Sequence, residues 1–194
     1  MGLTRTMEII RLATWIDAPV ERCFLLSLSM DLHAATLRPA RERGGIRANR
    51  LIAEGETVVL EGRPFGIGHT SRIDVLRPHS YFRDVMVAGA FRHYVHEHHF
   101  APMDDGTRMR DEIRFSTGWG PVARILARKR IKAFLKERNA LIKRVAQSEE
   151  WRRYLEEGAA NQVPPPIKAS SARWQGTSLL QGARRIVVPP RPHA

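Results

Sequence analysis

One stretch of the sequence, residues 91–102, carries rings at alternate positions and is uninterrupted by a turn residue before its final proline. The rings on one side of this alternation are Tyr94, His96, His98 and Phe100. Successive side chains of a strand point to opposite faces of a sheet, so these four share a face. The pattern predicts a long strand with one aromatic, titratable face.

A second strand follows after a tight turn. Asp104-Asp105-Gly106 is a hairpin signal, and residues 108–115 then alternate between apolar and charged side chains more regularly than any other segment. With a two-residue loop, His98 pairs with Asp111 and Phe100 with Met109. A bulge at Gly106 would shift the register by one residue and turn the histidines outward.

Length and composition favour one globular core. The chain has 194 residues, of which 43% are hydrophobic, and no apolar run approaches the eighteen or so residues that a membrane span needs. Residues 1–7 do not resemble a secretory signal, and the single cysteine, Cys23, excludes an intramolecular disulfide framework. We therefore expect a cytoplasmic protein.

The remaining segments give a simple order of elements. Glu8 to Ile16 is a predicted strand, and Asp17 with Pro19 is a helix-start signal for a short helix, with a second short helix over Met30 to Leu37. Six predicted strands follow, at 47–53, 57–65, 68–76, 81–87, 91–101 and 108–115. Their short connections imply an antiparallel meander, and hence an α+β fold.

A long helix is predicted from Pro121 to about Glu156. A stripe at helical spacing marks its inward face: Ala127, Ile131, Phe134, Leu141, Ile142 and Val145. Val122, Ile125 and Leu126 fall on nearly the opposite side of the same helix. We therefore expect either a kink near residues 127–130 or first turns that cover a different surface, such as a pocket rim.

The composition changes near residue 157, which divides the chain into a domain at 1–156 and a tail at 157–194. The tail is basic and rich in proline, has no acidic residue from Gly158 onward and no amphipathic period, and is predicted to be disordered. The tail and the long helix hold most of the net charge of +12. We favour a solvated, solubilising role for this charge. The alternative is weak contact with an anionic membrane or RNA, and no motif indicates specific DNA recognition.

The element order and several motifs resemble the helix-grip fold of the START / birch-pollen-allergen / polyketide-cyclase (SRPBCC) superfamily, in its small bacterial branch. The motifs lie at residues 16–24, 65–67, 82–86, 89–91, 96–100 and 106–111. The resemblance covers about residues 7–145, and it departs at Ala90, where the family turn usually has proline. It implies a curved antiparallel sheet wrapped around a long C-terminal helix, with a cavity between them that holds a hydrophobic ligand.

The two hairpins bring polar side chains to the face that such a cavity would use. A three-residue loop at 88–90 sets Tyr94 opposite Asp84 and His96 opposite Phe82, while Arg138 falls within the helix stripe. The predicted ligand-binding residues are Phe82, Met86, Tyr94, Phe100, Met109, Ile113, Phe134 and Arg138. This is the usual composition of a small-molecule site, mostly apolar with a few convergent polar groups.

Three interpretations of the polar residues stay open. The first is a carrier or sensor for a hydrophobic or amphipathic small molecule, lipid- or polyketide-like. The second is a polyketide cyclase/dehydratase, in which His96, His98, Asp111 and Asp84 are catalytic and a carboxylate sets the tautomer of an imidazole. The third is a buried network that only stabilises the fold. His96 and His98 with a carboxylate could also form a two-histidine, one-carboxylate metal site, but we expect no metal and no cofactor.

Overall fold

The computed structural model describes residues 6–37, 51–60, 69–155 and 183–186. Its elements in chain order are β1 (Glu8–Ile16), α1 (Val20–Leu28), α2 (Met30–Leu37), β2 (Thr57–Leu60), β3 (His69–Arg77), β4 (Tyr81–Ala88), β5 (His93–Met103), β6 (Gly106–Ser116), α3 (Pro121–Ala146), α4 (Trp151–Leu155) and β7 (Ala183–Ile186). None of the helices among these residues is long and apolar enough to cross a membrane.

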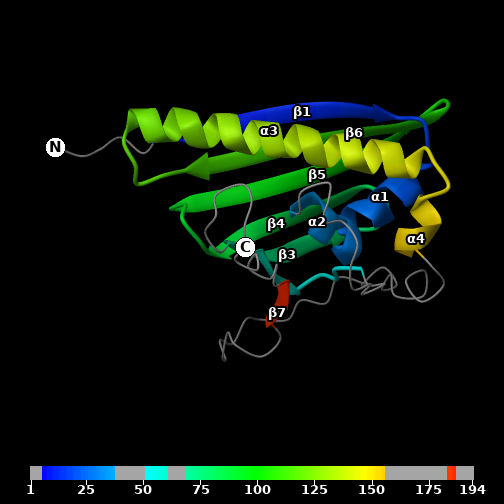
Figure 1. Cartoon of the computed structure of the whole chain (residues 1–194), viewed down its shortest axis with the longest axis horizontal. Helices are drawn as coiled ribbons and strands as arrows, with labels where there is room; N and C mark the ends of the chain where they lie inside the picture. The colour runs from blue at the N-terminus through cyan, green and yellow to red at the C-terminus, as the bar shows by residue number, and fades with distance from the viewer. Residues whose placement is uncertain (1–5, 38–50, 61–68, 156–182, 187–194) are drawn as a thin grey trace, which may run out of the picture.

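The strands form one sheet in the order β1-β6-β5-β4-β3-β2-β7. Every neighbouring pair is antiparallel except β2 and β7, which run parallel. The long helix α3 runs alongside β1, and α1 contacts α3, β5 and β6 at one end of the sheet (Figure 1). This curved antiparallel sheet with a long C-terminal helix confirms the predicted helix-grip fold.

The register of the central hairpin is as predicted. His98 pairs with Asp111 and Phe100 with Met109, so no bulge at Gly106 displaces the histidines. The register between β4 and β5 differs from the prediction by two residues, since His96 pairs with Asp84 and His98 with Phe82. The last pair is Val85 with Val95, so the connection uses more residues than the three expected. A shift of two preserves the face of each side chain.

The long helix is shorter than predicted and is unbroken along its length. It is continuous over residues 121–146, and the backbone N–H of Gln147 closes it on the carbonyl of Lys143 at 3.0 Å. Ser148 then donates its hydroxyl to the Val145 carbonyl at 3.3 Å, a local bond that competes with further helix. The side chains of Val122, Ile125 and Leu126 are exposed, so these three residues cover no pocket rim among the described residues.

Two apolar clusters form the core. One joins α1 and α2 to the α4 end of the molecule and includes Phe24, Phe82 and Met109. The other joins β6 to the first half of α3 and includes Ile113 and Ile131. Asp111 lies between Met109 and Ile113 along β6, so a polar layer separates the two clusters.

Several predicted segments lie outside the described residues. These are the strand at 47–53 up to residue 50, the second strand beyond residue 60, and most of the tail. Leu51 makes an isolated antiparallel bridge with Ser29. Within the tail that we expected to be disordered, Ala183–Ile186 forms β7, because a parallel strand on the open edge of β2 needs only backbone pairing and no amphipathic pattern.

Candidate functional site

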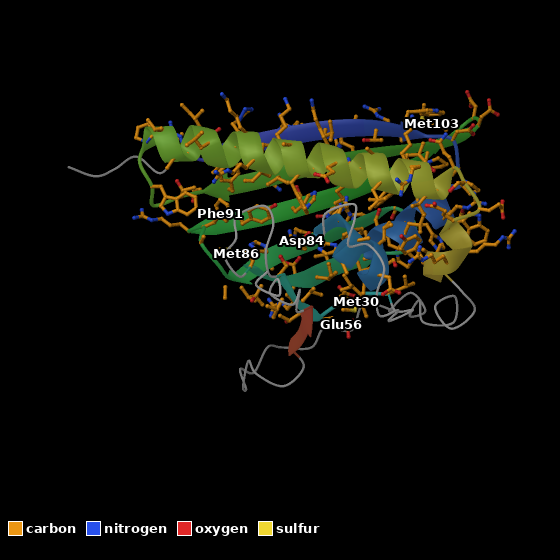
Figure 2. The ribbon with its side chains drawn as sticks, in the orientation of Figure 1. Met30, Glu56, Asp84, Met86, Phe91 and Met103 are labelled. Atoms are coloured by element: carbon orange, nitrogen blue, oxygen red, sulfur yellow. The ribbon has the colours of Figure 1, made fainter. Side chains whose placement is uncertain are left out.

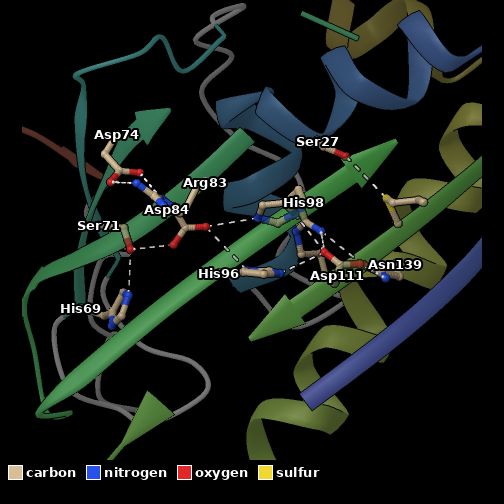
Figure 3. A network of polar contacts seen from close by, with 12 residues as sticks. Ser27, His69, Ser71, Asp74, Arg83, Asp84, His96, His98, Asp111 and Asn139 are labelled. Atoms are coloured by element: carbon tan, nitrogen blue, oxygen red, sulfur yellow. Dashed lines mark hydrogen bonds and ion pairs between the residues drawn. The ribbon is translucent and has the colours of Figure 1, made fainter. Parts of the chain in front are cut away.

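A polar network crosses the face of the sheet that looks towards α3 (Figure 3). Four neighbouring elements supply it: Asp84 from β4, His96 and His98 from β5, Asp111 from β6, and Arg138 with Asn139 from α3. The strand residues meet because their positions are paired across the ladders and share one face. The structure therefore brings together all four predicted catalytic residues.

Asp111 is the buried centre of this network, with a side chain that is 0% exposed. Its Oδ1 accepts a hydrogen bond from His96 Nε2 at 3.0 Å, and its Oδ2 accepts one from Asn139 Nδ2 at 2.7 Å. Arg138 Nη1 lies 3.5 Å from Oδ1. The carboxylate is thus surrounded by donors, as a buried charge requires.

Asp84 is the second carboxylate, on the other side of the two imidazoles. Its Oδ2 accepts a hydrogen bond from His98 Nε2 at 3.2 Å and lies 3.6 Å from His96 Nδ1. Its Oδ1 accepts the Ser71 hydroxyl at 3.2 Å, and Ser71 is in turn 2.9 Å from His69 Nε2. Each imidazole of the pair therefore presents one nitrogen to Asp84 and the other to Asp111.

The pKa values of the network favour ionised carboxylates and a neutral His96. Burial alone raises the pKa of Asp84 and of Asp111, but hydrogen bonds from the imidazoles and their nearby charge lower both below the ordinary value. Burial, together with His98, lowers the pKa of His96 to about 4 despite its bond to Asp111. Burial and the Arg138 guanidinium lower the pKa of His33, on α2, to about 3.

Exposure rises steadily from one end of the network to the other. The side chain of Asp111 is 0% exposed, that of His98 2%, that of His96 9% and that of Asp84 17%. Half-buried His69, Met86 and Tyr94 lie on the Asp84 side, with the rings of His69 and Tyr94 5.0 Å apart. Asp84 and Met86 are two positions apart on β4, on the same face of the strand (Figure 2). The network is therefore reached from the β3–β4 side.

The predicted ligand-binding residues divide into two groups. Phe82, Phe100, Met109 and Ile113 are at most 5% exposed and pack within the apolar clusters, and the side chain of Arg138 is buried beside Asp111. Met86, Tyr94 and Phe134 are half-buried. Only the second group, together with Asp84, presents surface that a ligand could contact.

The cavities among the described residues agree with this division. Beside Arg138 and His33 the space between α2 and α3 holds about 10 Å³, room for roughly one water molecule. A larger apolar hollow of about 270 Å³ lies between α1 and α4, against Leu25, Trp151 and Leu155, and none of the network residues lines it. The titratable groups identify the Asp84 side as the candidate site rather than this larger hollow.

The sequence reasoning missed several members of the network. Asn139 interrupts the apolar stripe of the long helix, next to Arg138, and its position within that stripe was the available signal. His69 and Ser71 alternate on a predicted strand, and the same alternation places both on the face of Asp84. No pattern in the sequence around His33 indicates that it lies close to these polar residues.

Comparisons with known proteins bear on the fold. No protein-family model matches the sequence, and no curated protein matches it significantly. The structure of norcoclaurine synthase from Thalictrum flavum, a point mutant in complex with a transition-state analogue, is similar over 77% of this chain and 99% of its own, with 10% identity and a TM-score of 0.53. The major latex-like protein 151 of Panax ginseng is similar over 73% of this chain and 99% of its own, with 12% identity and a TM-score of 0.49.

A third similar structure is the di-domain aromatase/cyclase StfQ from the steffimycin biosynthetic pathway, over 74% of this chain and 52% of its own, with 13% identity and a TM-score of 0.46. The strand order, the central hairpin register and the long C-terminal helix agree with the expectation drawn from the sequence motifs. The chain therefore has the helix-grip fold that the sequence motifs predicted.

Proposed function

We propose that the protein binds a hydrophobic or amphipathic small molecule on the Asp84 side of the polar network. The polar group of the ligand meets Asp84 and His96, and its apolar part lies against Met86 and Tyr94. The observation that carries this proposal is the gradient of exposure, from a fully buried Asp111 to an Asp84 that is 17% exposed. A few polar groups converging at the edge of an apolar surface are typical of a ligand site.

The energetics of the network also support a binding role. The buried Asp111 carboxylate, the half-buried Asp84 carboxylate, two imidazoles and a guanidinium are expensive to desolvate, and buried ion pairs of this kind often contribute no more stability than apolar side chains of similar volume. A network that served stability alone would gain nothing from opening towards half-buried aromatic and apolar groups. The proposed site lies at the Asp84 edge of the network, since the space beside Arg138 among the described residues holds only about 10 Å³.

The test uses native mass spectrometry of the freshly purified full-length chain, followed by titration with the fluorescent amphiphile 1-anilinonaphthalene-8-sulfonate. We expect a retained small molecule or saturable dye binding that Met86→Ala weakens at least threefold. Val87→Ala is the matched control, since Val87 is the next residue of β4 on the opposite face and is 47% exposed. Equal binding by the two variants would contradict the proposal.

Cyclase or dehydratase chemistry is the second candidate, and one observation favours it. Among the described residues His96 Nδ1 has no hydrogen-bond partner; it lies 3.6 Å from Asp84 Oδ2 and belongs to the imidazole nearer the open edge. It is the nitrogen that could accept a proton from a bound substrate, with Asp111 setting the tautomer. A pKa of about 4 makes this imidazole a weak base near neutral pH, so binding receives the stronger support.

A synthetic poly-β-keto thioester tests this second candidate. Cyclisation with loss of water, followed by mass spectrometry, should be abolished in His96→Gln while dye binding is retained. Unchanged turnover after substitution of all four residues, Asp84, His96, His98 and Asp111, would exclude it.

The exposed first turns of α3 favour peripheral membrane contact as a third candidate. Val122, Ile125 and Leu126 are 72%, 52% and 49% exposed. Exposed cations follow them on the helix, at Lys129, Arg130, Lys132 and Lys136. An apolar patch beside basic side chains matches the surface of an anionic bilayer better than RNA, which would not require the apolar residues.

Cosedimentation with vesicles of phosphatidylcholine alone, or mixed with phosphatidylglycerol, tests the membrane contact. We expect binding only to the anionic vesicles at low salt, and its loss in a variant with serine at residues 122, 125 and 126. A variant truncated after Glu157 measures how much the tail contributes to vesicle binding. Binding to polyuridylate without vesicle binding would contradict the membrane assignment.

A further inference from the structure

The two imidazoles and Asp84 have the composition of a transition-metal site. One nitrogen of His96, one nitrogen of His98 and one carboxylate oxygen of Asp84 all lie within 4.8 Å of one another. Imidazole nitrogen and carboxylate oxygen are common ligands of Zn²⁺ and other first-row divalent ions. We propose that Asp84, His96 and His98 bind one divalent transition-metal ion, with Zn²⁺ as the ion to test.

Two of the separations between ligand atoms are already near those around a bound ion. Metal–ligand distances of about 2.1 Å in a tetrahedron place neighbouring ligand atoms roughly 3.4 Å apart. Asp84 Oδ2 lies 3.2 Å from His98 Nε2 and 3.6 Å from His96 Nδ1. All three atoms lie within 4.8 Å of one another, and an ion drawn between them would take the place of the His98–Asp84 hydrogen bond.

The ring nitrogens that would not bind the ion, His96 Nε2 and His98 Nδ1, both lie next to Asp111. His96 Nε2 donates to Asp111 Oδ1 at 3.0 Å, and His98 Nδ1 lies 2.9 Å from the same oxygen. A carboxylate that accepts the outer N–H of a metal-bound histidine fixes the tautomer and the orientation of the ring. Asp111 is itself held by Asn139 at 2.7 Å, so the supporting shell extends into α3.

One atom of this arrangement is unsatisfied without an ion. His98 Nδ1 is buried and makes no hydrogen bond of acceptable angle, although it is 2.9 Å from Asp111 Oδ1. A neutral His98 that donates through Nε2 to Asp84 turns the lone pair of Nδ1 towards a carboxylate oxygen. Coordination through Nε2 moves the proton to Nδ1, and a rotation of the imidazole ring would then let Nδ1 donate to Asp111 Oδ1.

The charge of the site indicates what the fourth position would hold. Two carboxylates balance one divalent ion, and Arg138, 3.5 Å from Asp111, adds one positive charge. A hydroxide or an anionic oxygen of the ligand would neutralise the loaded site. Such a group would enter on the side of Asp84, which is the most exposed of the three proposed ligands. This last step rests on the proposed ligand-binding function, whereas metal binding itself does not.

The full-length protein, stripped with EDTA and dialysed, is titrated with ZnCl₂ by calorimetry, and bound metal is counted by elemental analysis. We expect one equivalent bound with a dissociation constant in the micromolar range or below, and at least 100-fold weaker binding in Asp84→Asn and in His98→Gln. His99→Gln is the matched control, because it removes a neighbouring imidazole on the opposite face of β5 and should bind as the wild type does.

A spectroscopic measurement does not depend on the variants folding. Co²⁺ added to the wild type should give the intense visible absorption of a four-coordinate nitrogen and oxygen site, and Zn²⁺ should remove it. Less than a tenth of an equivalent of Zn²⁺ in the wild type, or binding that His99→Gln reduces as much as His98→Gln, would overturn the metal site. Dye binding is measured on the same stripped protein, so failure of the metal site and failure of the ligand site are seen separately.

Discussion

Asn139 on α3 donates its side-chain N–H to Asp111 on β6 at 2.7 Å, and this contact joins the long helix to the centre of the sheet. The same amide nitrogen reaches Thr14 on β1 at 3.2 Å. Replacing Asn139 with alanine removes a donor from a buried ionised carboxylate and leaves a space beside it. Hydrogen bonds to charged groups contribute about 1.5–3 kcal/mol. We expect Asn139→Ala to lower the free energy of unfolding in urea by about that amount.

The control for this variant is Lys136→Ala on the same helix. Lys136 is exposed, and alanine has a helix propensity at least as high as that of lysine. Its urea midpoint should equal that of the wild type. A similar loss in both variants would mean that the Asn139 contact contributes nothing specific.

Asp111→Asn should have a larger effect than Asn139→Ala. The substitution is isosteric but removes the charge on which His96, His98 and Arg138 converge. Removing one partner of a buried ion pair typically costs about 3–5 kcal/mol, because the other charge stays buried without compensation. Thermal and urea unfolding measure the loss. Asp104→Asn, in the exposed β5–β6 turn, is the control and should leave stability unchanged.

Stability should fall between pH 6.5 and pH 4.5. The pKa of His33 is lowered to about 3 and that of His96 to about 4, whereas an unfolded histidine titrates near 6.5. As the pH falls below 6.5, the unfolded chain therefore binds protons that the folded chain does not, and unfolding becomes easier. Above about pH 5 the histidines dominate this loss, because the carboxylates of the unfolded chain titrate near pH 4.

Urea unfolding at three pH values across this window tests the sign. His33→Gln should reduce the pH dependence of the free energy of unfolding, because glutamine does not titrate. The stability of this variant at pH 7.5 is the reference for its values at lower pH. Stability that rises as the pH falls from 6.5 to 4.5 would contradict neutral imidazoles at His33 and His96 in the folded protein.

The central hairpin was predictable because two independent constraints agree there. Alternation fixed the faces of residues 91–102 and 108–115, and the short Asp104-Asp105 turn fixed their register. For β4 and β5 only the alternation was available, since Ala88-Gly89-Ala90 marks a turn without setting its length. The predicted pairs of Asp84 and His96 were therefore wrong by two residues while their faces were right.

The composition of the polar network was less accessible from the sequence. Arg138 was placed inward by its position in an apolar stripe, and the same argument applied to Asn139 would have found it. The exposed Val122, Ile125 and Leu126 show the converse error, since apolar residues at helical spacing need not be covered. What sequence patterning lacks is the tertiary partner, here Asp111 for Asn139.

Gly106 and Gly120 form a matched pair for the last prediction. A Cβ added at Gly106 would lie 2.4 Å from the carbonyl oxygen of Ile16 and 3.2 Å from the Cα of Asp17, both backbone atoms that cannot rotate away. The β5–β6 turn therefore packs directly against the end of β1. At Gly120, before α3, no atom lies within 4 Å of the added Cβ.

Gly106→Ala should consequently displace the end of β1 and destabilise the protein by about 1–3 kcal/mol, the usual range for forced overpacking. Gly120→Ala should leave the free energy of unfolding unchanged or raise it slightly, because alanine restricts the unfolded chain at a position whose backbone it tolerates. Urea unfolding compares the two. Since the strain at Gly106 arises at Ile16 and Asp17, amide hydrogen exchange in the Gly106→Ala variant should quicken first at the end of β1 and the start of β6, and uniform quickening across the sheet would contradict a local clash.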